Sequence, residues 1–316
     1  MNKKMAEILG IDTSNYTTSA ALLDTDRMSV VQSKLLLPVK SGERGIRQSD
    51  AVFHHVKQLP TVIDGVCRGI VPDGIGVSVK PRTAEGSYMP CFLAGESAAR
   101  MLGSVLGIEP EYTSHQTGHV LAALFSAGRL GLVLEKQTFA AFHVSGGTTD
   151  LLLCEPDDDT LLRITRVGGS SDLNAGQAVD RCGVMLGLDF PCGQELEKLA
   201  SRSGRQFKAR VPVKGLDCSL SGIENKCRKM YDDNEPREDI AKFCLDSVLS
   251  AVSGLTDALY ENYGSMTVIY AGGVMSNSYI RSKLEGDGRF FCEPEFSRDN
   301  AAGTAVYCAL RKGLIK

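Results

Sequence analysis

Two histidines at helical spacing are the residues of this chain that most directly suggest chemistry. His115 and His119 lie four residues apart in a segment, 115–127, whose apolar residues recur with a helical period. Residues at i and i+4 share one face of a helix, so both imidazoles can reach a single cation. Two imidazole donors suit Zn²⁺ or Fe²⁺ better than Mg²⁺. On spacing alone, two structural histidines near a domain interface are an equally good interpretation.

A third ligand for such a metal has to come from another part of the chain. Asp299, just before the last expected helix, is the candidate. The alternative is an aspartate that only caps that helix. A zinc protease would require the pattern HExxH, but Gln116, Thr117 and Gly118 separate the two histidines, so the sequence argues against a metalloprotease.

Two segments about 130 residues apart resemble each other. Residues 7–23 and 139–153 each read as an apolar strand, a turn of small polar residues and a second apolar strand. Such a turn presents backbone N–H groups and hydroxyls to a phosphate. The pair predicts two related domains whose turns hold a nucleotide across a cleft, and two ordinary hairpins are the alternative.

A glycine-rich turn and a lone carboxylate are further candidates for nucleotide binding. Residues 271–277 follow an expected strand, and Gly272 and Gly273 let a ring or phosphate approach the backbone. Asn277 can then hydrogen-bond the adenosine. Asp180 can accept from ribose hydroxyls, although a solvated helix carboxylate is the commoner role of a single aspartate.

The composition fits a cytoplasmic α/β protein. The chain has 316 residues with 33 glycines, no tryptophan and a net charge of −3, which excludes a uniformly basic coat for nucleic acid. No apolar run approaches the roughly 20 residues that span a bilayer, and no secretory signal is seen. The ten cysteines form no CxxC pair, so they are expected to be mostly small buried residues, without a zinc knuckle.

Strands alternating with helices predict an α/β fold with two domains, 1–128 and 129–316. The last helix is expected to pack back on the N-terminal domain. A basic stretch without clear periodicity covers 201–229. The expected helices are 51–68, 93–106, 115–127 (capped by Thr113 or Ser114), 174–186, 194–201, 239–260 and 300–311, and the expected isolated strands are 74–79 and 266–270.

Eight motifs in order resemble the threonylcarbamoyladenosine synthase family, the TsaD and KEOPS catalytic subunit family that was once described as glycoprotein endopeptidases. The resemblance covers nearly the whole chain. The motifs are Ile11–Ser14, Ser114–His119, Val144–Gly147, Ala175–Asp180, Leu186–Pro191, Ser219–Gly222, Gly272–Asn277 and Ser297–Ala302.

This resemblance implies an actin-like ATPase fold, the fold of sugar kinases, heat-shock ATPases and actin, with two ribonuclease-H-like lobes around a nucleotide cleft. It implies a divalent metal, Fe²⁺ or Zn²⁺, on His115, His119 and Asp299, with Asp12 and Ser14 as the catalytic residues. The implied contacts to an adenine nucleotide (threonylcarbamoyl-AMP, AMP or ATP) are Val144, Ser145, Gly146, Gly147, Thr148, Asp180, Gly193, Gly272, Gly273 and Asn277.

The family reaction moves a threonylcarbamoyl group from its AMP anhydride to N6 of an adenosine in tRNA. The implied partners are tRNA and the paralogous and ATPase proteins of a tRNA-modification complex, and a homodimer is an alternative. The basic stretch, which includes Arg202, Arg205 and Lys229, would meet phosphates, or it is a solvated charged surface.

Three departures from the family pattern leave other functions open. Tyr16 and Thr17 replace an Asp-Glu pair, Thr148 replaces a histidine, and residues 79–90 replace a Gly-Pro-Gly loop and bring Lys80, Arg82 and Glu85. A non-catalytic or regulatory nucleotide-binding paralogue that acts through a partner subunit is therefore the alternative function. A small-molecule kinase or carbamoyltransferase on the same fold is a third hypothesis. Kinases of this fold usually place a catalytic aspartate in the cleft, and the sequence offers no convincing candidate for it.

Overall fold

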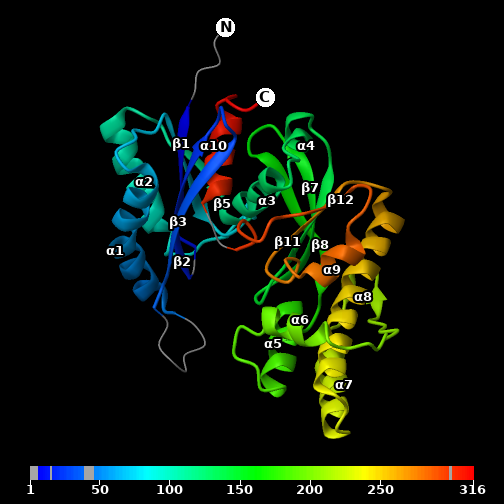
Figure 1. Ribbon diagram of the computed structural model, residues 1–316. Helices are drawn as coiled ribbons and strands as arrows, with labels where there is room; N and C mark the ends of the chain where they lie inside the picture. The colour runs from blue at the N-terminus through cyan, green and yellow to red at the C-terminus, as the bar shows by residue number, and fades with distance from the viewer. Residues whose placement is uncertain (1–5, 15, 39–45, 299–300) are drawn as a thin grey trace. The chain divides into compact units, whose positions relative to one another are not determined.

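The computed structural model describes residues 6–14, 16–38, 46–298 and 301–316 (Figure 1). By their internal contacts the described residues form two compact units. Unit 1 takes in residues up to 136 together with 156–163 and 298–316, and unit 2 takes in 137–155 and 164–297. Each unit contains one β-sheet and its own helices, so the predicted α/β class is confirmed.

The sheet of unit 1 has the strand order β3-β2-β1-β4-β5. The first three strands form antiparallel pairs, and β1, β4 and β5 run parallel. The first predicted hairpin is confirmed, with Glu7 opposite Asp24 and Asp12 opposite Ser19. The strands are β1 (Glu7–Asp12), β2 (Thr17–Asp24), β3 (Ser29–Leu36), β4 (Gly74–Lys80) and β5 (Glu111–Ser114).

Two pairs of helices cover the two faces of this sheet (Figure 1). On one face lie α1 (Gln48–Cys67) and α2 (Phe92–Leu106), which bury the apolar residues around Leu9, Ile11 and Val77. On the other face lie α3 (His115–Ser126) and α10 (Ala302–Arg311). The short helix α4 (Gly131–Leu134) completes the unit.

Glycines allow α10 to lie directly on the sheet and on α3. A Cβ atom on Gly303 would lie 1.7 Å from the carbonyl oxygen of Gly118, and one on Gly76 would lie 2.0 Å from that of Thr304. A Cβ on Gly10 would lie 2.2 Å from the carbonyl oxygen of Ala301. Since no real Cβ approaches backbone so closely, hydrogen at these positions is what permits the close packing.

The sheet of unit 2 has the order β12-β11-β6-β7-β8-β10-β9. The second predicted hairpin is confirmed, because β6 pairs with β7 in antiparallel register. Strand β11 runs parallel to β6 and β12. The strands are β6 (Phe139–Val144), β7 (Thr149–Asp157), β8 (Leu161–Ser170), β9 (Val213–Lys214), β10 (Asp217–Cys218), β11 (Val268–Ala271) and β12 (Arg289–Phe291).

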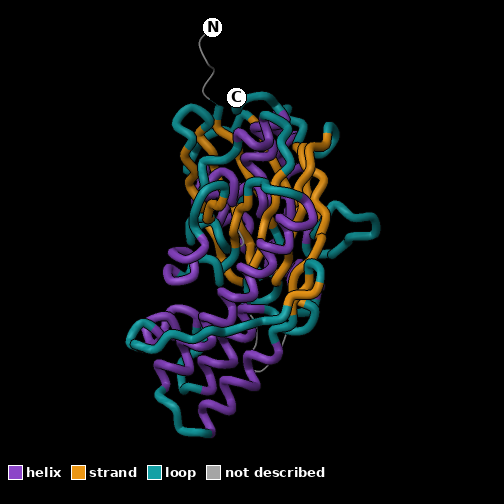
Figure 2. Tube along the Cα trace, turned by 90° about the vertical axis from the view of Figure 1, so that its right-hand side faces the viewer, coloured by secondary structure: helices purple, strands orange, loops and turns teal. Residues whose placement is uncertain are grey.

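Five helices belong to unit 2: α5 (Ala175–Met185), α6 (Gly193–Ala200), α7 (Ser221–Asp232), α8 (Arg237–Tyr263) and α9 (Ser278–Leu284). In both views α5, α6 and α7 lie at the lower end of the unit, below its strands (Figures 1 and 2). Across the described ranges, none of the helices combines the length and the apolar character that crossing a membrane requires.

The sequence analysis predicted no helix in the basic stretch 201–229, although α7 begins within it. The start of α7 depends on a residue that is distant in the sequence. The carboxylate of Asp172 accepts hydrogen bonds from the backbone N–H of Leu220 (2.8 Å) and of Ser221 (3.3 Å), and from the Ser219 hydroxyl (2.6 Å). These donors lie at the start of α7, where backbone N–H groups lack partners within the helix. A capping residue some 50 positions away leaves no local signal in the sequence.

The Gly303 contact predicts a selective loss of stability. Gly303→Ala should lower the free energy of unfolding by about 2 kcal/mol, because the added methyl group forces α10 away from Gly118. Gly118→Ala is the matched control, since its Cβ would meet Thr304 at ordinary distances, 3.5 Å from Cγ2 and 3.9 Å from the backbone nitrogen. Urea unfolding followed by circular dichroism measures both variants, and equal stability of the two would contradict this account of the packing.

Candidate functional site

The first candidate site is built around the buried carboxylate of Asp12, which is 1% exposed at the end of β1. Its Oδ2 accepts from the Ser14 hydroxyl at 2.6 Å, and its Oδ1 accepts from the Ser78 hydroxyl and lies 3.1 Å from Nδ1 of His115. Because β1, β4 and β5 are parallel neighbours, their carboxyl ends meet at one edge of the sheet and bring these residues together.

The two predicted metal-binding histidines lie side by side at the start of α3. The Nε2 atoms of His115 and His119 are 2.9 Å apart, and Ser114 caps the helix by accepting from the backbone N–H of Thr117. An ionised carboxylate only accepts hydrogen bonds, so Nδ1 of His115 must carry a proton and donate to Asp12. This tautomer leaves the Nε2 lone pair of His115 directed toward His119. The donor set fits a divalent metal held by two imidazoles with a carboxylate behind one of them.

Opposing effects determine the charge of Asp12. Burial acts to raise its pKa, but the imidazole of His115 and the hydroxyls of Ser14 and Ser78 outweigh burial and leave the pKa below its usual value. Asp12 is therefore ionised at neutral pH and provides the negative charge that orients His115.

A buried histidine that the sequence analysis did not identify lies beside this group. His55 on α1 is fully buried, and its Nδ1 lies 2.8 Å from the hydroxyl of Thr18, which donates to Oε1 of Gln58 at 2.6 Å. Since the Thr18 proton goes to Gln58, Nδ1 of His55 is the donor to Thr18. Its Nε2 has no hydrogen-bond partner among the described residues. Burial lowers the pKa of His55 to about 4, although the charge of Asp12 acts to raise it.

The second candidate site, in unit 2, is the turn between β6 and β7. The Ser145 hydroxyl accepts from the backbone N–H of Gly147 (3.3 Å) and of Thr148 (3.2 Å) and lies 2.8 Å from the Thr148 hydroxyl. The N–H groups thus converge on one oxygen, as they do in an anion-binding nest. Hydrogen bonds of this length are weak enough for a phosphate oxygen to replace them.

Two further segments of unit 2 adjoin this turn. The N–H of Gly176, at the start of α5, donates to the carbonyl of Ser145 at 3.2 Å, and the side chain of Asn174 donates to the carbonyl of Gly147 at 2.9 Å. A Cβ on Gly272, which has a φ of +100°, would lie 2.2 Å from the Val144 carbonyl oxygen. The predicted glycine-rich segments therefore do meet around Val144–Thr148.

Several predicted ligand contacts have structural partners of their own. Asp180 accepts from the backbone N–H of Cys192 at 2.9 Å, and burial raises its pKa. Asn277 caps α9 by accepting from the N–H of Ile280 at 2.9 Å. By contrast, a Cβ added to Gly146, Gly147, Gly193 or Gly273 would meet nothing within 4 Å, so these glycines border open space that a ligand can enter.

Comparisons with known proteins show the family to which the chain belongs. The family model for TsaD, tRNA N6-adenosine threonylcarbamoyltransferase, matches residues 37–306. A protein of Thermosipho africanus (strain TCF52B) named tRNA N6-adenosine threonylcarbamoyltransferase is 32% identical, over 97% of this chain and 95% of its own length. The chain belongs to the TsaD family. Members of this family generally use a divalent metal and an adenine nucleotide.

Solved structures place the chain in the actin-like ATPase fold, as predicted. Component A of the (R)-2-hydroxyglutaryl-CoA dehydratase of Acidaminococcus fermentans matches with a TM-score of 0.53 and 16% identity, over 98% of this chain and 99% of that one. Full-length HypF, in a phosphate- and nucleotide-bound form, matches with a TM-score of 0.59 and 12% identity, over 97% of this chain and 55% of that one. At these identities the likeness shows the fold alone.

The departures from the TsaD pattern lie close to the two sites. Thr17 is buried and its N–H donates to the Ser14 carbonyl at 3.0 Å, while Tyr16 is 37% exposed. The loop that replaces Gly-Pro-Gly adjoins the histidines, because the Pro81 carbonyl accepts from the N–H of Gln116 at 3.0 Å. Asp299, the predicted third metal ligand, lies outside the described residues.

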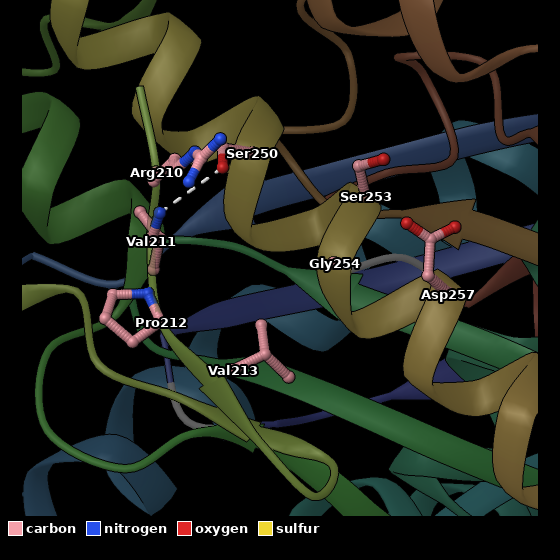
Figure 3. A pocket seen from close by; sticks show the side chains of 8 residues that line it. All are labelled: Arg210, Val211, Pro212, Val213, Ser250, Ser253, Gly254 and Asp257. Carbon is pink, nitrogen blue, oxygen red and sulfur yellow. Dashed lines mark hydrogen bonds between the residues drawn. The ribbon is translucent and has the colours of Figure 1, made fainter. Parts of the chain in front are cut away.

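A separate pocket of about 570 Å³ lies on unit 2, between residues 210–213 and α8 (Figure 3). Within it the N–H of Val211 donates to the Ser250 hydroxyl at 3.3 Å, and Ser253 and Asp257 lie farther along α8. Arg210 from the basic stretch lines it. None of the residues that the TsaD motifs predict lines this pocket.

The buried, neutral His55 predicts a pH dependence of stability. The pKa rises from about 4 in the folded protein to the ordinary 6.5 on unfolding, so the unfolded chain binds the extra proton. Stability should therefore fall as the pH drops from 6.5 toward 4, by about 2 kcal/mol between pH 7 and pH 4.5. The pKa of Asp12 is lowered below its ordinary value of 3.8, so protonation of Asp12 reduces the stability only at a lower pH than this range.

Urea unfolding of the wild type and of His55→Gln across this range measures the effect. The variant should lose most of the pH dependence, while His54→Gln, a neighbouring substitution, should retain it. An unchanged slope in His55→Gln would show that other groups cause the acid sensitivity.

Proposed function

We propose that this protein transfers a threonylcarbamoyl group from its AMP anhydride to N6 of an adenosine in tRNA. The observation that carries the proposal is the Asp12–His115–His119 array in a chain that belongs to the TsaD family. The alternative is a regulatory paralogue that binds nucleotide without turnover, and the transfer assay below separates the two.

In this proposal His115 and His119 hold a divalent metal through their Nε2 atoms, and Asp299 is the predicted third ligand. Zn²⁺ and Fe²⁺ both suit this donor set. The metal, when bound, supplies a Lewis acid for the carbonyl or phosphate oxygen of the donor. Asp12 keeps the Nδ1 proton of His115 in place, and Ser14 and Ser78 hold Asp12. These contacts support a positioning role for Asp12 and Ser14, and their direct participation in transfer stays a prediction.

Unit 2 would hold the adenylate part of the donor. The turn Ser145–Thr148 offers N–H groups and hydroxyls to the phosphate, and the open faces of Gly147, Gly193 and Gly273 leave room for the nucleoside. Asp180 is the candidate acceptor for the ribose hydroxyls. The Nδ2 group of Asn277 is the candidate donor to adenine, since its Oδ1 caps α9.

The acceptor amine of adenosine is a weak nucleophile, so the reaction depends on positioning. The basic stretch 201–229 is the candidate contact surface for tRNA phosphates. Part of its charge is already used within the protein, since Arg205 pairs with Glu235 at 2.5 Å and with Asp239 at 3.6 Å. Paralogous and ATPase partner proteins, as in the family's tRNA-modification complexes, remain the proposed partners.

The transfer assay tests the function directly. Purified protein, with its partner proteins, threonylcarbamoyl-AMP and tRNA, should form N6-threonylcarbamoyladenosine. The double variant His115→Ala/His119→Ala should lose bound metal and reduce transfer by about 100-fold or more, because both imidazole ligands are gone. His54→Ala is the control histidine outside the array and should retain both properties.

Mass spectrometry of nucleosides from digested tRNA reads the product, and elemental analysis reads the metal. Unmodified tRNA with the complete set of components would contradict the proposed transfer. Nucleotide and metal binding without any turnover would favour the regulatory alternative.

The nucleotide site makes a separate prediction. Gly146→Val should weaken AMP binding by about tenfold or more, because the side chain enters the space beside the Ser145–Thr148 turn while meeting no protein atom within 4 Å. Gly204→Val, at another open position of unit 2, is the matched control. Isothermal titration calorimetry measures both, and unweakened binding in Gly146→Val would place the nucleotide elsewhere.

A further inference from the structure

Three cysteines from three helices meet in the core of unit 2. Cys182 lies on α5, Cys227 on α7 and Cys244 on α8, and their Sγ atoms all lie within 4.8 Å of one another. Each residue is at most 1% exposed. The three helices contact one another in pairs, so packing rather than a sequence motif creates the cluster (Figure 1).

The donor atoms of the cluster are all cysteine sulfurs. Cys244 Sγ donates to the carbonyl oxygen of Ala178 at 3.9 Å. No carboxylate or imidazole belongs to the group, and the surrounding core is apolar, with Ile223, Ile240 and Val248. Three thiolates without hard donors select a thiophilic ion and reject Mg²⁺ or Ca²⁺.

The spacing of the sulfurs suits a single ion. With metal–sulfur bonds of about 2.3 Å, three sulfurs around one ion lie roughly 4 Å apart, so closing from the observed spacing takes less than about 1 Å at each atom. We propose that Cys182, Cys227 and Cys244 form a buried binding site for a divalent d¹⁰ metal ion of the Zn²⁺ class. Binding replaces thiol protons, which leave to solvent, and it requires no oxidant.

This site is independent of the transferase proposal, because its ligands all belong to unit 2 and the histidine pair belongs to unit 1. The competing interpretation is that the cysteines only fill the core as small apolar residues. An ion would cross-link α5, α7 and α8 and stabilise the folded unit, whereas core-filling thiols predict no response to a thiophilic ion.

Cadmium is the probe, because Cd²⁺ bound to thiolates absorbs in the ultraviolet by charge transfer and imidazole-bound Cd²⁺ does not. Titration of the metal-free His115→Ala/His119→Ala protein should give a saturable thiolate band at about one Cd²⁺ per chain. Adding Cys227→Ser should abolish that stoichiometric binding. Adding Cys218→Ser, a buried cysteine of the same unit outside the cluster, should leave it unchanged.

If a cluster variant fails to fold, X-ray absorption on the Cd²⁺-loaded His115→Ala/His119→Ala protein, the parent of these variants, still tests the site. Three sulfur neighbours around cadmium would support the site. The absence of a thiolate band in the parent, or a band that Cys227→Ser leaves intact, would overturn the proposal and make the cysteines core-filling residues.

Discussion

The burial of one charge organises unit 1. An ionised carboxylate in a protein interior is tolerated only with hydrogen-bond donors around it, and Asp12 obtains them from Ser14, Ser78 and His115. These donors come from the end of β1, from β4 and from the start of α3, so the parallel register of the sheet must be correct before the charge is satisfied. The same contact determines the tautomer of His115, which links the folding of the sheet to the chemistry of the histidine pair.

Close backbone approach is the corresponding constraint at the proposed nucleotide site. Gly176 and Gly272 let the start of α5 and the segment after β11 come within van der Waals contact of residues 144–146, where any side chain would clash. Gly146, Gly147 and Gly273 serve a different purpose, since they face open space. The first group of glycines forms the site, and the second leaves it accessible to a ligand.

Patterns of neighbouring residues in the sequence predicted the elements that depend on neighbouring residues. The two hairpins and the helix that carries both histidines were predicted correctly from such patterns, and of the two expected caps, Thr113 and Ser114, it is Ser114 that caps this helix. The actin-like fold was predicted correctly from the resemblance to the TsaD family. Interactions between distant residues left no such pattern. Ser78 reads as an ordinary residue of a buried strand, His55 as one position on an amphipathic helix, and α7 depends on Asp172 from another segment. The three clustered cysteines are separated by 45 and 17 residues in sequence, so no spacing motif announces them.

Asp12 accepts from Nδ1–H of His115 and so leaves the Nε2 lone pair available to the proposed metal. Nitrogen-15 NMR of the histidine imidazoles in the metal-free protein measures this tautomer directly. Nδ1 of His115 should be protonated at neutral pH in the wild type, and Asp12→Asn should weaken this preference. A neutral His115 with its proton on Nε2 in the wild type would contradict the account, because that nitrogen could not then bind a metal without losing the proton.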